Sequence, residues 1–136
     1  MPLEYDKYIS KIESAHIIAY LRLDGIVHVH ITENTTINVS VLDSINDCIQ
    51  KITDVPRQFI FQAGHGSTIT HKARKKSAKL QEDYPVISTA VIVEGAKQRM
   101  IANIFYALVK LNSPIKSFKN LEQCLIWSKQ ILNQEA

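Results

Sequence analysis

Groups that could hold an anion gather in one short stretch near the middle of the chain. Gly64 and Gly66 flank His65, and the hydroxyls of Ser67 and Thr68 follow directly. Two glycines let a backbone approach a ligand closely, while imidazole and hydroxyl groups supply hydrogen bonds and protons. The stretch precedes a predicted helix, whose first N–H groups attract anions. These residue types therefore predict a site for an anion or another small ligand.

The same stretch also fits a simple turn. The Gly-Lys-Ser/Thr ending of a phosphate-binding P-loop is missing, and a lone Gly-x-Gly pattern has little specificity. A glycine-rich turn, with Thr70 capping the helix that follows, uses the same residues without any ligand. The sequence favours this turn and leaves the ligand site as the alternative.

Basic residues crowd the predicted helix that begins at about Thr70. It carries five basic residues in eight: Lys72, Arg74, Lys75, Lys76 and Lys79. The four lysines lie three or four residues apart and share one helical face. Such a face could bind a nucleic acid or an acidic partner. Because no aromatic residues interleave for base stacking, nucleic acid is not an expected partner, and a solvated helix face is favoured.

Three histidines share one predicted strand face without the rest of a metal site. His28 and His30 alternate in one strand, and the expected pairing brings His16 to the same face. A His-x-His pair can bind zinc, but the ligand set is incomplete. We therefore expect partly exposed histidines and neither a metal nor a cofactor. No Ser-His-Asp or Cys-His order appears, so no catalytic residue is predicted.

Length and composition are those of an ordinary globular domain. With 136 residues, 46% hydrophobic and 21% charged, the chain fits a single domain spanning residues 1–136. The N-terminus lacks the basic and apolar regions of a signal peptide, and no apolar run approaches the ~20 residues needed to cross a membrane. Cys48 and Cys124 have no CxxC spacing, which favours two reduced thiols. We therefore expect a cytoplasmic protein that does not contact membranes.

Two alternating segments predict an antiparallel hairpin over residues 15–33. A two-residue Asp-Gly turn would pair Leu21 with His28 and place apolar residues opposite histidines. A three-residue loop, with Gly25 in the left-handed conformation, instead pairs Leu21 with Val27 and collects the apolar residues on one face. A slip of one residue would scatter this face, so we predict the three-residue loop.

The remaining segments alternate between helices and strands. Helices are predicted over 38–52 and 70–80, from Gly95 to about Leu108, and from Asn120 to about Leu132, with the last residues, 133–136, disordered. Strands are predicted over 59–61, 86–93 and 115–118. The last helix is expected to turn Leu121, Cys124, Leu125, Ile131 and Leu132 inward. The result is an α/β fold of order ββαβαβαβα. It has a single mixed β-sheet, with an N-terminal antiparallel hairpin and then largely parallel strands, packed by four helices.

Three segments and Trp127 also carry a resemblance to a known family. They are residues 25–29 in the second strand, 70–74 at the start of the basic helix, and 114–118 before the last helix. With these segments the chain resembles the STAS, or anti-anti-sigma-factor-like, superfamily, and looks most like its small uncharacterised bacterial members. The resemblance implies a regulatory, non-enzymatic domain, in which a partner kinase phosphorylates a serine in a strand-to-helix turn. The corresponding region is Gln62–His71, where Ser-Thr-Ile replaces the Ser-Ser-Gly of the family.

These observations predict a non-catalytic regulatory or protein-interaction domain. Its candidate binding residues are Gly64, His65, Gly66, Ser67, Thr68, Thr70, His71, Lys72 and Arg74. The alternative is a small-anion-binding protein or an enzyme that uses His65 or His71. The expected partner is another protein or a small anion, and a homodimer is left open.

Overall fold

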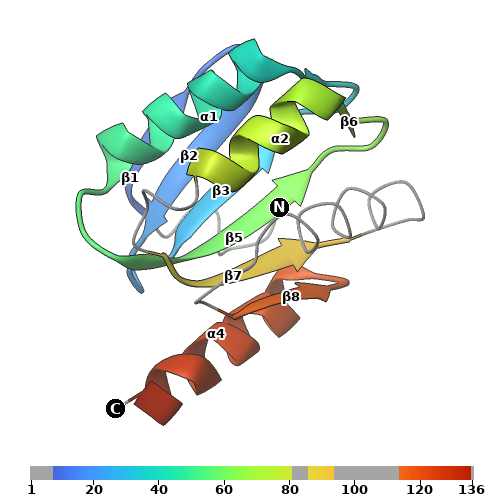
Figure 1. Ribbon diagram of the computed structural model, residues 1–136. Coiled ribbons are helices and arrows are strands. Elements are labelled where there is room, and N and C mark those ends of the chain that lie inside the picture. The colour runs from blue at the N-terminus through green and yellow to red at the C-terminus, as the bar shows by residue number, and fades with distance from the viewer. Residues whose placement is uncertain (1–7, 81–85, 94–113, 136) are drawn as a thin grey trace.

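A six-stranded mixed β-sheet forms the middle layer of the structure, a computed structural model that describes residues 8–80, 86–93 and 114–135. The strands of this sheet are β1 (Tyr8–Glu13), β2 (Ile17–Arg22), β3 (Val27–Ile31), β5 (Arg57–Ala63), β7 (Val86–Ile92) and β8 (Ile115–Phe118). A separate pair contains β4 (Thr36–Ile37) and β6 (Thr68–Ile69). The helices are α1 (Val39–Ile52), α2 (His71–Leu80) and α4 (Leu121–Glu135). Helices α1 and α2 lie on one side of the sheet and α4 lies on the other (Figure 1).

The main sheet follows the order β1-β2-β3-β5-β7-β8. Strands β1, β2 and β3 are antiparallel, and β3, β5, β7 and β8 are parallel. The predicted mixed sheet, with a hairpin followed by parallel strands, is therefore confirmed. The sequence pattern did not indicate β1. Its side chains are mostly exposed, so it shows no alternation of apolar residues, and its backbone pairing with β2 is what makes it a strand at the edge of the sheet.

The β2–β3 hairpin has the predicted register. Leu21 pairs with Val27 and Ala19 pairs with Val29. Gly25 has a φ of 85°, and the Arg22 N–H donates to the Ile26 carbonyl at 2.9 Å. Because only this register places the alternating apolar residues on one face, hydrophobic burial selects the three-residue loop over the two-residue turn.

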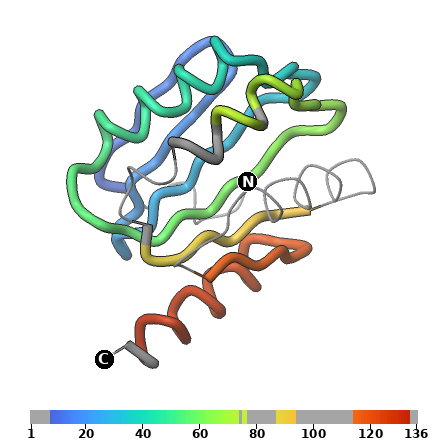
Figure 2. Tube along the Cα trace, in the orientation of Figure 1, coloured from blue at the N-terminus to red at the C-terminus, as the bar shows by residue number. Residues whose placement is uncertain are grey.

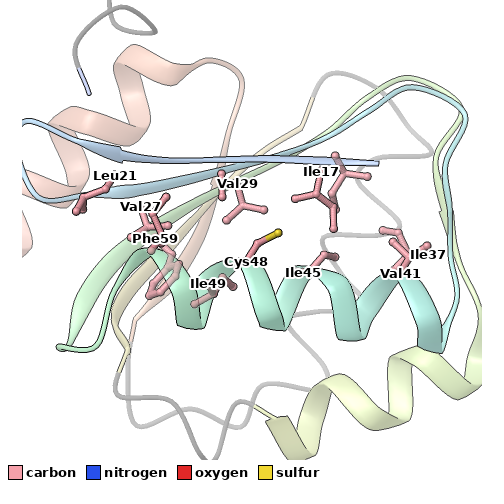
Figure 3. Close-up of a cluster of buried hydrophobic side chains, with 13 residues drawn as sticks. Ile17, Leu21, Val27, Val29, Ile37, Val41, Ile45, Cys48, Ile49 and Phe59 are labelled. Carbon is pink, nitrogen blue, oxygen red and sulfur yellow. The ribbon is translucent and has the colours of Figure 1, made fainter. Parts of the chain in front are cut away.

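Helix α1 covers the apolar face of this hairpin. Its start is capped by Asn38, whose Oδ1 accepts a hydrogen bond from the Val41 N–H at 2.9 Å. Ile45, Cys48 and Ile49 point from the helix toward the sheet, where residues of β2, β3 and β5 complete the core (Figure 3). The predicted helix and its cap are confirmed.

Helix α4 packs against the opposite face (Figure 2). Asn120 caps it, since its Oδ1 accepts from the Gln123 N–H at 2.9 Å. Cys124 and Ile131 are buried as predicted, but Leu132 is 42% exposed, so its inward placement was wrong. Ser128 is fully buried instead. It lies one helical turn after Cys124 and one before Ile131, on the face of α4 that packs on the sheet, and Leu132 lies beside that face. Both cysteines are free and buried, and burial raises the pKa of the Cys124 thiol to about 12.

Part of the predicted architecture lies outside the described residues. The helix predicted from Gly95 falls within residues 94–113, so the described ranges hold three of the four predicted helices. None of the helices in these ranges is long and apolar enough to cross a membrane.

Candidate functional site

The Gly64–Thr68 loop follows the carboxyl end of β5 and packs against the connection between β3 and α1. The two connections form the short parallel pair β4–β6, in which Thr36 aligns with Thr68. The Thr68 N–H donates to the Thr35 carbonyl at 3.0 Å, and the Thr70 N–H donates to the Ile37 carbonyl at 3.0 Å. The loop is therefore held by a neighbouring backbone segment that lies about thirty residues earlier in the sequence.

Both glycines of the loop are explained by this close packing. A Cβ on Gly64 would lie 2.6 Å from the Glu33 nitrogen, which is closer than real Cβ atoms approach. Gly66 has a φ of 78°, and a Cβ there would overlap the side chain of Asn34. Asn34 itself adopts a φ of 56°, a left-handed conformation that asparagine tolerates. The glycines thus allow two connections to pack against each other. This supports the interpretation of the loop as a turn over its interpretation as a ligand site.

Ser67 links the two connections from the inside. Its side chain is buried, with 1% of the residue exposed. The Ser67 Oγ donates to the Thr32 carbonyl at 3.1 Å and accepts from the Thr35 N–H at 3.3 Å. The hydroxyl of Thr68, by contrast, belongs to an exposed residue. Of the two hydroxyls in the predicted site, Ser67 therefore serves the fold and only Thr68 faces the surroundings.

Backbone donors of the loop are also used within the protein. The Gly64 N–H donates to the Ile31 carbonyl at 2.8 Å, and the Ser67 N–H donates to the Gly64 carbonyl at 3.3 Å. With the amides of Thr68 and Thr70, four N–H groups of this stretch already have protein acceptors. An anion bound here would have to compete with these hydrogen bonds.

The start of α2 presents cations outward. Thr70 caps the helix, as predicted, by accepting from the Ala73 N–H at 3.1 Å, and Ala73 is fully buried. His71, Lys72 and Lys75 are exposed. Lys76 instead makes an ion pair with Asp43 of α1 at 2.6 Å, so the predicted lysine face is not wholly solvated. The side chains of Arg74 and Lys79, which complete the predicted basic residues, lie outside what the structure describes.

Of the three histidines predicted to be partly exposed, His28 differs from the prediction. His28 is buried, with 1% exposed, where partial exposure was expected, and its Nε2 hydrogen bonds to Gln62 Oε1 at 3.2 Å. Burial, together with the charges of His30 and Arg22, lowers the pKa of His28 to about 4 even though the hydrogen bond to Gln62 raises it, so the ring is neutral at pH 7. His16 is exposed and His30 is half-buried. Within the described ranges, no cluster of three or more His, Cys, Asp or Glu side chains could hold a metal ion.

Sequence reasoning missed the residues on the β3–α1 side of the loop. Asn34 and Thr35 contribute to the contact as much as the glycines do. The signal was the polar run Glu-Asn-Thr-Thr after a predicted strand, which is typical of a turn and offers a left-handed asparagine. That run indicates a turn, but it does not indicate that this turn packs against the Gly64–Thr68 loop.

Comparison with other proteins gives a family but no characterised relative. No curated protein and no solved structure matches the chain. One family model matches residues 19–132, from β2 nearly to the end of α4 and including the whole loop contact. By this match the chain belongs to the family described as Domain of unknown function (DUF7793).

Proposed function

We propose that this protein is a non-catalytic regulatory domain that binds an acidic surface of a partner protein through the basic start of α2. We define the basic start as His71, Lys72 and Lys75, whose side chains are exposed. One observation carries the proposal: the cations Lys72 and Lys75 lie in the first two turns of a helix whose first turn holds no acidic residue.

Cations are unfavourable at this end of a helix. The N-terminus carries a partial positive charge of about half a unit, which stabilises nearby anions and repels cations. An exposed charge in the first turn, such as that of Lys72, changes stability by roughly 0.3–1 kcal/mol. A carboxylate-rich partner would reverse this cost, because its charges would neutralise both the lysines and the helix end. A local energetic conflict of this kind is typical of functional surfaces.

Three contacts hold the basic start in place. Thr70 caps the helix, Ala73 is fully buried beneath it, and Lys76 pairs with Asp43 of α1 at 2.6 Å. A surface that is fixed before binding loses little conformational entropy when the partner arrives. This anchoring supports a partner-binding surface over a set of loosely solvated lysines.

The proposal includes a STAS-like arrangement with four helices in a cytoplasmic bacterial protein, in which β1, β4 and β6 are added to the predicted order ββαβαβαβα. In the superfamily that this arrangement resembles, a partner kinase acts at the turn corresponding to Gln62–His71. The basic start of α2 begins at His71, the last residue of that turn. Since Ser67 is buried and both of its hydrogen bonds are internal, we carry over the location of partner binding and not the phosphorylation of this serine.

A small anion at the Gly64–Thr68 loop is the second candidate. It is favoured by the exposure of His65 and Thr68, which lie next to the basic start. It ranks second because four N–H groups of the stretch already donate to protein carbonyls. An enzyme that uses His65 or His71 would need this same loop to hold its substrate. Evidence against the anion site would therefore also be evidence against such an enzyme.

NMR titration of the full chain distinguishes the two candidates. A poly-glutamate peptide should shift the amides of residues 71–76 in the wild type, and the shifts should shrink as salt rises. The double variant Lys72→Glu with Lys75→Glu should lose these shifts, while Lys129→Glu, on the exposed side of α4, should keep them. Equal shifts in all three proteins, or none in the wild type, would overturn the proposal. Inorganic phosphate that shifts residues 64–68 more than poly-glutamate shifts residues 71–76 would favour the anion site instead.

A further inference from the structure

A second polar cluster lies on the other side of the molecule, buried where α4 packs on the sheet. Gln58 of β5 is 3% exposed, and Ser88 of β7 and Ser128 of α4 are fully buried. Gln58 and Ser88 lie two residues before Ile60 and Ala90 in their strands, and Ser128 lies four residues after Cys124, so they share a face with the apolar cluster that these residues form. Neutral polar groups in such surroundings need hydrogen-bond partners, because water of the bulk solvent cannot reach them.

The orientation of the Gln58 amide is fixed by its neighbours. Its Nε2 donates to the Ser88 Oγ at 2.9 Å and to the Ser128 backbone carbonyl at 2.6 Å. Rotating the amide by half a turn would bring Oε1 against the Ser128 carbonyl oxygen, and two acceptors would then face each other. The Gln58 Oε1 must therefore point away from these two partners.

Among the described residues, two buried atoms of this cluster have no hydrogen-bond partner. Neither Gln58 Oε1 nor Ser128 Oγ has a hydrogen bond to any residue in the described part of the chain. The Ser128 hydroxyl could turn to a carbonyl one helical turn earlier, as helix serines often do. Even then Gln58 Oε1, a pure acceptor, would still need a donor.

We propose that a buried water molecule is bound here, donating one hydrogen to Gln58 Oε1 and hydrogen bonding to Ser128 Oγ. Water fits because the site offers both an acceptor and a hydroxyl that can donate or accept, and buried waters typically have two to four such polar partners. A cation fits poorly, since Gln58, Ser88 and Ser128 bring no carboxylate to balance its charge. The water is then part of the interface that holds α4 on the sheet.

A high-resolution crystal structure of the full chain tests this proposal. We expect a solvent peak at hydrogen-bond distance, ~2.5–3.0 Å, from Gln58 Oε1 and with Ser128 Oγ as a second partner. No peak there, or a protein donor directly on Oε1, would overturn the proposal. A peak that gains anomalous signal when Rb⁺ replaces Na⁺ in the crystal would mark a cation and would also overturn it.

Two variants test whether the solvent peak depends on the Gln58 amide. Gln58→Met keeps much of the side-chain volume but removes the amide, so the solvent peak should disappear. Ser40→Ala, which changes an exposed serine of α1, should leave the peak unchanged. If Gln58→Met does not fold, NMR of the wild type decides: a nuclear Overhauser effect from a long-lived water to the Gln58 side-chain amide supports the proposal, and its absence overturns it.

Discussion

Replacing Gly64 with alanine distinguishes a packed loop from an open, ligand-facing one. Gly64 is not in the left-handed region, so its backbone accepts alanine without strain. In open space the substitution would raise the free energy of unfolding by about 0.4–1 kcal/mol, because alanine restricts the unfolded chain. In the structure the new Cβ would lie 2.6 Å from the Glu33 nitrogen and 2.9 Å from the Thr32 carbonyl carbon. The sign of the change therefore reports whether this contact exists.

We expect Gly64→Ala to lower the free energy of unfolding by about 1–3 kcal/mol, since backbone atoms of the neighbouring connection must move. Equilibrium unfolding in urea, followed by the fluorescence of Trp127, the one tryptophan of the chain, measures the change. Ser40→Ala serves as the control, because an exposed substitution should alter stability by no more than about 0.5 kcal/mol. A Gly64→Ala protein as stable as the wild type, or more stable, would refute the packing and restore the loop as a ligand site.

Three further predictions use the same unfolding assay. Ser67→Ala should cost about 1–3 kcal/mol, because it leaves the buried Thr35 N–H without its acceptor; a neutral result would contradict the link between the two connections. The pKa of His28 is lowered from 6.5 to about 4, so the unfolded state takes up the proton first. Its contribution to stability should therefore fall by up to about 3 kcal/mol between pH 6.5 and 4, and a His28→Gln variant should lack this part of the pH dependence. Ile60→Ala, at a fully buried position, should cost about 2–5 kcal/mol, whereas Ile126→Ala, at a position 53% exposed, should cost far less; similar losses would contradict the described core.

The sequence by itself determined the features that depend on neighbours along the chain. Alternation of apolar residues set the pairing of Leu21 with Val27, because a slip of one residue would turn every side chain to the wrong face. Asn38, Thr70 and Asn120 were recognisable as helix caps, since a cap accepts from an N–H only three residues later. The main mixed sheet followed from the alternation of such segments, whereas its edge strand β1 and the separate β4–β6 pair were not predicted.

Only the tertiary structure decided what these elements bring together. The contact between Gly64 and Glu33 arises because β3 and β5 are neighbours in the sheet, which places their following connections side by side. The same placement turned Ser67 from a candidate ligand group into an internal link. His28 looked partly exposed by alternation, yet it is buried, with its ring hydrogen bonded to Gln62 of the neighbouring strand β5. Alternation reports which residues share a face, and only the packing of layers decides whether that face meets water.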